Sequence, residues 1–176
     1  MSRIKAITPE QATGHTAEVY SAITKALGKV PNLFQAVGVN SNALQALLGI
    51  GPSLKTLSGA EKETIALVVA QKNNCGYCLS AHTLLASMHG ISKDDSLNIR
   101  KGTPQSAKQK ALVNFVSEIV TEKGHVSDKT FDEFKAAGYT DAHVPDVLFA
   151  VVENFYTNFF NHINKTEIDF PIAEKI

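Results

Sequence analysis

The chain has 176 residues, of which 44% are hydrophobic, so it can bury a sizeable core and is expected to form a single domain over residues 1–176. Lysine and arginine together number 17, as do aspartate and glutamate, and the resulting zero net charge gives no electrostatic basis for binding nucleic acid or an anionic membrane. No apolar run approaches the roughly 18 residues of a membrane span, and no apolar segment follows the basic start, so we expect a cytoplasmic protein without a secretory signal.

Helical patterns occupy the first third of the chain. Thr8-Pro9-Glu10-Gln11 is typical of a capping box with proline at the first helical position, and it predicts a helix that ends at Gly28. A short helix is expected at residues 34–37. Asn40 should cap the next helix, which Gly51-Pro52 should end or kink.

The central third contains two adjacent helical patterns. Ser58-Gly59-Ala60-Glu61 is a second capping box, and it starts a strongly apolar helix that Asn73-Asn74 interrupts. A new helix is expected to begin near Cys75 and to run to Gly90. A further short helix is expected at residues 94–100.

The last third also has helical patterns. Thr103-Pro104 should open a helix that closes at Gly124, and Ser127 should cap a short one. The last long helix is expected to open near Thr140 or around Pro145. Because no segment alternates with the period of two that is typical of strands, the sequence predicts an all-α fold with an extended tail.

The only two cysteines lie in a cluster with an acid and a base. Cys75 and Cys78 form a Cys-x-x-Cys pair, His82 follows four residues later, and Glu63 lies twelve residues before the pair. Since helical positions three and four apart share a face, the two thiols and the imidazole can point into one pocket. In a reducing compartment such a pair indicates redox or metal chemistry rather than a structural crosslink.

A position near a helix N-terminus favours the thiolate form of a cysteine, because unpaired N–H groups and the helix dipole favour negative charge there. This effect favours Cys75 as the attacking sulfur, whereas the four-residue spacing from the base His82 favours Cys78. If Glu63 on the preceding helix reaches His82, its carboxylate would hold the imidazole in one tautomer and raise its basicity.

Two alternatives to redox chemistry remain for the cysteine pair. The thiols could form a buried apolar pair without chemistry, or they could provide half of a zinc site together with His82. A structural zinc site needs four ligands, usually from two such pairs, and the chain has one pair. The sequence also lacks a phosphate-binding glycine loop and a dinucleotide fingerprint, so no cofactor and no metal is expected.

The arrangement Glu63, Cys75-Gly-Tyr-Cys78, His82 resembles the AhpD-like alkylhydroperoxidase branch of the carboxymuconolactone decarboxylase family. The early segment Val30-Pro-Asn-Leu-Phe and the tail Thr166-Glu-Ile-Asp-Phe-Pro resemble its peroxidase-related members. One position departs from the pattern: Tyr77 stands where the AhpD motif has a histidine directly before the second cysteine.

The resemblance implies an AhpD-like helical fold that assembles as a homotrimer or hexamer. It also implies a thiol-dependent peroxidase that reduces organic hydroperoxides. By position, Cys78 would attack the peroxide, Cys75 would resolve the product into a disulfide, and Glu63 with His82 would relay protons. A dithiol protein or a small thiol would then restore the pair. The alternatives are a disulfide reductase or exchange protein and a non-enzymatic redox-sensing oligomer.

Overall fold

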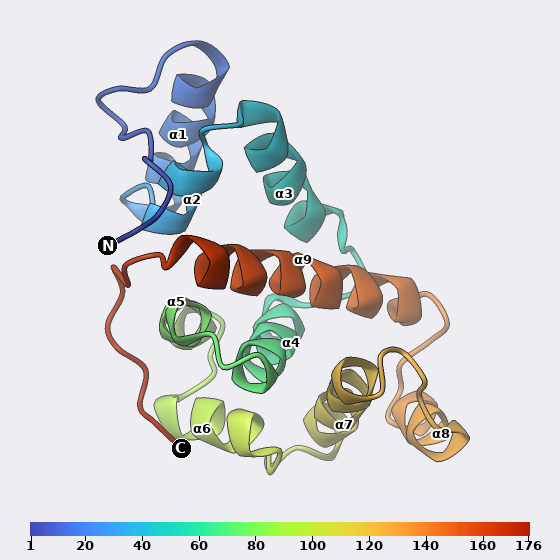
Figure 1. Cartoon of the computed structure of the whole chain (residues 1–176). Helices are drawn as coiled ribbons and strands as arrows, with labels where there is room; N and C mark the ends of the chain where they lie inside the picture. The colour runs from blue at the N-terminus through green and yellow to red at the C-terminus, as the bar shows by residue number, and fades with distance from the viewer.

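A computed structural model describes residues 1–176 and contains nine helices and no strand (Figure 1), which confirms the predicted all-α class. The helices are α1 (Gly14–Leu27), α2 (Asn32–Val37), α3 (Ser41–Ser53), α4 (Gly59–Lys72), α5 (Gly76–Met88), α6 (Lys93–Lys101), α7 (Ala107–Thr121), α8 (Asp128–Ala136) and α9 (His143–Asn164). None of them is both long enough and apolar enough to cross a membrane.

Helices α4 and α9 organise the rest of the molecule. Helix α4 packs against α5, α7 and α9. Helix α9 lies between α1–α3 on one side and α4–α5 on the other (Figure 1), and it contacts α2, α3, α4, α5 and α7. The residues after α9 form an extended tail, as predicted, and the tail returns along α5 and ends near α6.

Two apolar clusters fill the interior. The larger cluster joins α4, α7, α8 and α9, and its aromatic rings stack face to face from Phe115 through Phe134 to Tyr139. The smaller cluster joins α1, α2, α3 and α5, and both cysteines belong to it. The thiols are therefore surrounded by apolar side chains, which strengthens electrostatic effects on them.

Three of the predicted helix caps are confirmed. The Asn40 side chain accepts a hydrogen bond from the backbone N–H of Ala43 at 3.2 Å, and helix α3 ends one residue after Pro52. Ser58 and Glu61 form a complete capping box at the start of α4. Ser127 caps α8 by accepting a hydrogen bond from the N–H of Thr130 at 3.3 Å.

The predicted start of the first helix is wrong. Only half of the capping box at Thr8 forms: the Gln11 side chain accepts a hydrogen bond from the Thr8 N–H at 3.3 Å, but the Gln11 N–H bonds to the Thr8 carbonyl, and the segment forms a single turn. Thr13 is then extended and Gly14 has a φ of 52°, so helix α1 begins only at Gly14. A β-branched residue followed by glycine is a poor helix-forming pair, and the first turn cannot propagate through it.

Two later helix starts also differ from the prediction. Thr103 does not open α7, because its N–H bonds to the Asn98 carbonyl and so completes the end of α6 at the left-handed Gly102. Ser106 caps α7 instead, by accepting a hydrogen bond from the N–H of Gln109 at 3.4 Å. Helix α9 begins at His143, between the two expected starts.

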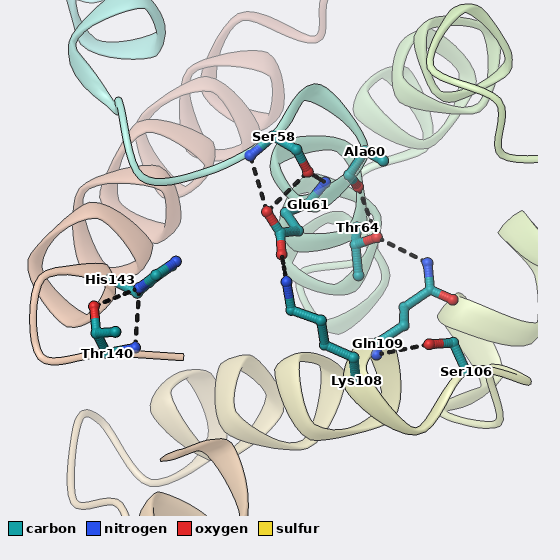
Figure 2. A network of polar contacts seen from close by, with 9 residues as sticks. All are labelled: Ser58, Ala60, Glu61, Thr64, Ser106, Lys108, Gln109, Thr140 and His143. Carbon is teal, nitrogen blue, oxygen red and sulfur yellow. Dashed lines mark hydrogen bonds and ion pairs between the residues drawn. The ribbon is translucent and has the colours of Figure 1, made fainter. Parts of the chain in front are cut away.

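A polar network joins the start of α4 to α7 (Figure 2). Lys108 forms an ion pair with Glu61 at 2.9 Å, and the Gln109 side chain donates a hydrogen bond to the Thr64 hydroxyl at 3.1 Å. The Lys108 ammonium also lies over the Tyr139 ring, 4.7 Å from its centroid. These contacts hold the face of α4 that points away from the cysteines against α7. They thereby fix the orientation of the opposite face of the helix.

Candidate active site

The turn between α4 and α5 places the first cysteine at a helix N-terminus. Asn73 ends α4, and Asn74 adopts a left-handed conformation with a φ of 54°, which asparagine tolerates better than most residues. Cys75 is the N-cap of α5, and its sulfur accepts a hydrogen bond from the Cys78 N–H at 3.4 Å. The predicted position of the Cys-x-x-Cys pair at a helix start is therefore confirmed.

The two thiols are free and lie side by side. Their sulfur atoms are 2.9 Å apart, which is hydrogen-bonding distance and well beyond the roughly 2.05 Å of a disulfide. Cys75 is 1% exposed and Cys78 is 2% exposed, so neither sulfur is open to bulk solvent. Cys78 lines the large cavity described below, whereas Cys75 lies behind it and does not. A small molecule in the cavity would thus meet Cys78.

The acid and the base meet between neighbouring helices. The Nδ1 atom of His82 on α5 lies 2.9 Å from the Oε2 atom of Glu63 on α4. Both side chains are largely buried, at 22% and 12% exposed. Burial alone would lower the pKa of His82, but the Glu63 carboxylate outweighs that effect and raises it. The Glu63 carboxylate therefore favours the protonated form of the imidazole, whose other nitrogen, Nε2, points away from this contact.

A cavity of about 460 Å³ contains Cys78, His82 and Glu63. Helices α2, α3, α5 and α9 and the tail contribute its mostly apolar walls, which include Leu33, Phe34, Leu47, Leu48, Leu85 and Phe170. Lys62 and Glu153 are further charged residues on the lining. Burial raises the pKa of Glu153, although His82 and Lys62 partly oppose the shift. An apolar chamber with a few convergent polar groups is typical of a small-molecule site.

The two sulfurs differ in their affinity for a proton. The pKa of the Cys75 thiol is lowered, because the Cys78 side chain and the Cys78 N–H both donate to its sulfur. The pKa of the Cys78 thiol is raised, because Cys75 holds the charge beside it and because it is buried. Negative charge is therefore favoured on Cys75 over Cys78, while the sulfur facing the cavity is that of Cys78. Transfer of one proton across the 2.9 Å between the sulfurs would convert the form charged at Cys75 into the form charged at Cys78.

Tyr77 does not act as a base, although it lies between the two cysteines. Its hydroxyl donates a hydrogen bond to Oδ1 of Asp169 in the tail at 2.8 Å and accepts one from the Leu33 N–H at 3.1 Å. Burial raises the pKa of this phenol, and Asp169 adds to the effect. Lys29 and the Asn32 N–H hold the same carboxylate through its second oxygen. Tyr77 thus anchors the tail against α2 and α5.

The structure brings together all four residues proposed from the sequence, and it adds Asn161, which sequence reasoning missed. The Nδ2 atom of Asn161 on α9 lies 3.3 Å from the Cys78 sulfur. A signal was present in the spacing, because Asn154, Asn158 and Asn161 recur at the intervals of one helix face. Without a fold, however, nothing in the sequence connects that face with a cysteine 83 positions earlier.

Comparisons with known structures agree with this fold. An uncharacterized peroxidase-related protein from Ralstonia eutropha JMP134 with an alkylhydroperoxidase AhpD core superposes with a TM-score of 0.85 at 16% identity, covering 96% of this chain and 92% of that one. A peroxidase-related protein from Silicibacter sp. TM1040 gives a TM-score of 0.80 at 22% identity, covering 95% and 94%. The all-helical chain therefore has the AhpD-like fold.

The same fold also occurs in a protein with different chemistry. The debrominase Bmp8 superposes with a TM-score of 0.80 at 17% identity, covering 96% of this chain and 93% of that one. A variant of Bmp8 in complex with 2,3,4-tribromopyrrole is similar as well, with a TM-score of 0.77. No curated protein matches this chain.

The central region of the sequence is similar to one protein family. Residues 42–101 match the model of the carboxymuconolactone decarboxylase family. These residues include α4, α5 and both cysteines. Over this region the chain is similar to that family, and over its length it has the AhpD-like fold.

Proposed function

We propose that the chain is a thiol-dependent peroxidase that reduces organic hydroperoxides through a Cys75–Cys78 disulfide cycle. The observation that carries the proposal is the convergence of three features on one apolar cavity. A reduced cysteine pair lies with its sulfurs 2.9 Å apart, Cys78 faces the cavity, and the His82–Glu63 pair borders the same space. The peroxidase-related names of the structural neighbours support the same class of activity.

The first step needs a thiolate at the sulfur that peroxide can reach. A peroxide in the cavity meets Cys78, whereas negative charge is favoured on Cys75. We assign the attack to Cys78 because it is the sulfur that a peroxide in the cavity can reach. A proton can pass between the two sulfurs, which are 2.9 Å apart, whereas a peroxide cannot pass through the protein to Cys75. Transfer of the Cys78 proton to Cys75 produces the attacking thiolate.

The Cys78 thiolate then attacks the distal oxygen of the hydroperoxide, and the O–O bond breaks. The sulfur is oxidised to sulfenic acid, and the alkoxide leaving group takes a proton from His82, held by Glu63, to become an alcohol. Cys75 attacks the sulfenic sulfur, so that a disulfide and one water molecule form. An external dithiol protein or small thiol reduces the disulfide and restores both thiols. The proposed compartment is the cytoplasm, where such thiols are kept reduced.

The cavity favours an organic peroxide over hydrogen peroxide. Its walls are mostly apolar, and apolar groups gain free energy when they leave water for such an environment. The burial of both sulfurs, at 1% and 2% exposed, favours small molecules over proteins as their direct partners. This burial weighs against the disulfide-exchange alternative, and it favours a small thiol over a dithiol protein as the reductant.

Stopped-flow mixing with cumene hydroperoxide tests the proposal. The reduced protein should lose both thiols in each chain, and equimolar hydrogen peroxide should act more slowly. Cys78→Ser should prevent the reaction, whereas Cys75→Ser should still form a sulfenic acid at Cys78 but no intramolecular disulfide. An unchanged thiol titre over minutes would contradict the proposal. Bromide release from 2,3,4-tribromopyrrole without any peroxide reaction would replace it with a debrominase-like activity.

We also propose that the chain forms a homo-oligomer through the outer face of α9. That face carries large apolar side chains that are 41% to 63% exposed: Leu148, Phe149, Val152, Tyr156, Phe159 and Ile163. A continuous apolar stripe of this kind is typical of an interface between chains. Light scattering should give a multiple of 19.0 kDa. Phe149→Lys with Ile163→Lys should lower the measured mass to that of one chain, whereas Val39→Lys, away from α9, should not.

A further inference from the structure

The inner face of α9 carries a row of buried asparagines. Asn154, Asn158, Asn161 and Asn164 are between 0% and 6% exposed. Buried amides cost free energy unless they are hydrogen-bonded, so each one needs a physical explanation. Asn164 ties down the N-terminal segment by accepting hydrogen bonds from the Arg3 and Ile4 N–H groups. Asn154 donates to the Ala150 carbonyl within its own helix.

Asn158 and Asn161 lie against the cysteine turn. Asn158 accepts a hydrogen bond from the Asn73 side chain at 3.1 Å, which fixes α9 to the turn that positions Cys75. Asn161 directs its amide Nδ2 to the sulfur of Cys78 at 3.3 Å, while its carbonyl oxygen has no hydrogen-bond partner in the protein. The hydrogen bond of the Asn161 side chain is therefore with the sulfur that faces the cavity. After the Cys78 side chain, the same amide makes a minor contribution to the lowered pKa of Cys75.

The donors available to the two sulfurs differ. Cys75 accepts from a backbone N–H as well as from the neighbouring thiol, so a charge on its sulfur is stabilised by the helix start. Cys78 has no backbone donor. The Thr157 hydroxyl, which donates to the Asn154 carbonyl, lies close enough to Cys78 to oppose the rise that Cys75 causes in its pKa, and it can serve as a second side-chain donor for that sulfur. Asn161 therefore provides the one N–H group directed at Cys78. An amide N–H is never lost by titration, so it favours the charged form of that sulfur at every pH.

We propose that Asn161 is a catalytic residue that stabilises the Cys78 thiolate and so shifts the shared proton from Cys78 to Cys75. The proposal rests on the peroxidase function proposed above and adds a step to it. The N–H of Asn161 donates to the Cys78 sulfur as the proton crosses to Cys75, and the charged sulfur then attacks the peroxide. The titratable groups around the pair are His82 and Tyr77 on α5, Glu63 on α4 and Glu153 on α9.

A single-thiol background tests the proposal without peroxide. In Cys75→Ser the only thiol is Cys78, and its alkylation by iodoacetamide as a function of pH reports its thiolate fraction. Adding Asn161→Leu removes the N–H donor while nearly preserving the shape of the side chain. The pH profile should move upward, with alkylation at pH 7 slower by about tenfold, since a hydrogen bond to a charged group is lost. His82, Glu63 and Glu153 are the same in both proteins.

Two controls separate this role from a structural one. Asn164→Leu, added to the same Cys75→Ser background, removes from the same helix a buried amide that holds the N-terminal segment rather than the cysteine turn, and it should leave the alkylation profile unchanged. Asn161→Ala provides a second test of the donor if the leucine variant does not fold. Thermal unfolding should show that the Asn164 and Asn161 variants are both destabilised.

The outcomes are distinguishable from those of the peroxidase proposal. Overlapping alkylation profiles for Cys75→Ser with and without the Asn161 substitution would overturn the role of Asn161, whatever the protein does with peroxide. A shifted profile would support that role even if wild-type protein left cumene hydroperoxide intact, in which case only the peroxidase function would fail. If both proposals hold, Asn161→Leu in the dithiol protein should slow peroxide oxidation by a similar factor.

Discussion

Helix α4 carries two carboxylates, Glu61 and Glu63, that are two residues apart and point toward different neighbouring helices. Glu61 faces α7 (Figure 2), where it accepts hydrogen bonds from the N–H and hydroxyl of Ser58 and pairs with Lys108. Glu63 faces α5 and contacts His82 at the edge of the cavity. Positions two apart do not share a helix face, so the same residue type meets two environments.

The comparison shows that partners, rather than burial, decide what each carboxylate can do. Burial alone would raise the pKa of Glu61, but Lys108 and Ser58 outweigh it and lower the pKa to about 2. That carboxylate stays charged at neutral pH, and every contact it makes is within the scaffold. Glu63 has an imidazole as its partner, and an imidazole exchanges protons near neutral pH. Only the second arrangement can move a proton during a reaction.

The largest expected effect comes from removing the charge at Glu63. Glu63→Gln keeps the side-chain shape but no longer favours a protonated His82, so the leaving alkoxide loses its proton donor. We expect peroxide-dependent thiol loss at pH 7 to slow by about a hundredfold, within the usual range for general acid catalysis. Stopped-flow thiol titration measures the effect. An unchanged rate would show that another group, such as Glu153, provides the proton.

The matched substitution at Glu61 should lower the stability of the protein but leave the rate of peroxide oxidation almost unchanged. Glu61→Gln weakens the capping box and removes the ion pair with Lys108, so the free energy of unfolding should fall by about 1 kcal/mol. The rate of peroxide oxidation should stay within about twofold of wild type, because no contact of Glu61 reaches the cavity. Urea denaturation and stopped-flow kinetics on the same sample test both statements. A large loss of rate would mean that the two faces of α4 are coupled.

Tyr77 provides an intermediate case, since it is a scaffold residue inside the Cys-x-x-Cys motif. Tyr77→Phe removes the hydrogen bonds to Asp169 and to the Leu33 N–H, but it keeps the ring that packs edge-on against Phe170. We expect a loss of about 1 kcal/mol in the free energy of unfolding. The tail should become more sensitive to proteolysis, while thiol oxidation should change little. A strong loss of oxidation rate would instead assign a chemical role to the phenol.

Local sequence signals predicted much of the fold because they act over one helical turn. Ser58 and Ser127 cap helices as expected, and Asn73-Asn74 separates the two central helices. The half-formed capping box at Thr8 shows the limit of such signals, because a local cap cannot extend a helix through Thr13 and Gly14. Helix propagation depends on the residues that follow the cap, and tertiary packing then selects the start.

The candidate site was predictable where its members are close in the sequence. Cys75, Cys78 and His82 lie within two turns of one helix, and Glu63 is on the helix before. Asn161 and Asp169 were not predictable, because each reaches the site from a segment more than 80 residues away. Their positions depend on how α9 and the tail pack, which no local pattern encodes. The apolar cavity likewise exists only once α2, α3, α5 and α9 have assembled.

The smallest expected effect distinguishes the two carboxylates by the sign of their pH dependence. The folded-state pKa of Glu61 is lowered from 4.5 to about 2, so its contribution to stability is complete above pH 4.5 and is lost as the pH falls toward 2. The folded-state pKa of His82 is raised from 6.5 through Glu63, so the contribution of that pair is complete below pH 6.5 and is lost as the pH rises through the raised value.

Urea denaturation of wild type, Glu61→Gln and Glu63→Gln across this pH range measures both trends. The difference between wild type and Glu61→Gln should shrink on acidification, whereas the difference between wild type and Glu63→Gln should shrink on alkalinisation. Each change should be about 1 kcal/mol or less, because both pairs retain some contact with solvent. Two trends of the same sign would mean that Glu63 acts as a second fixed charge, and the contrast between the two faces of α4 would then disappear together with the proton relay.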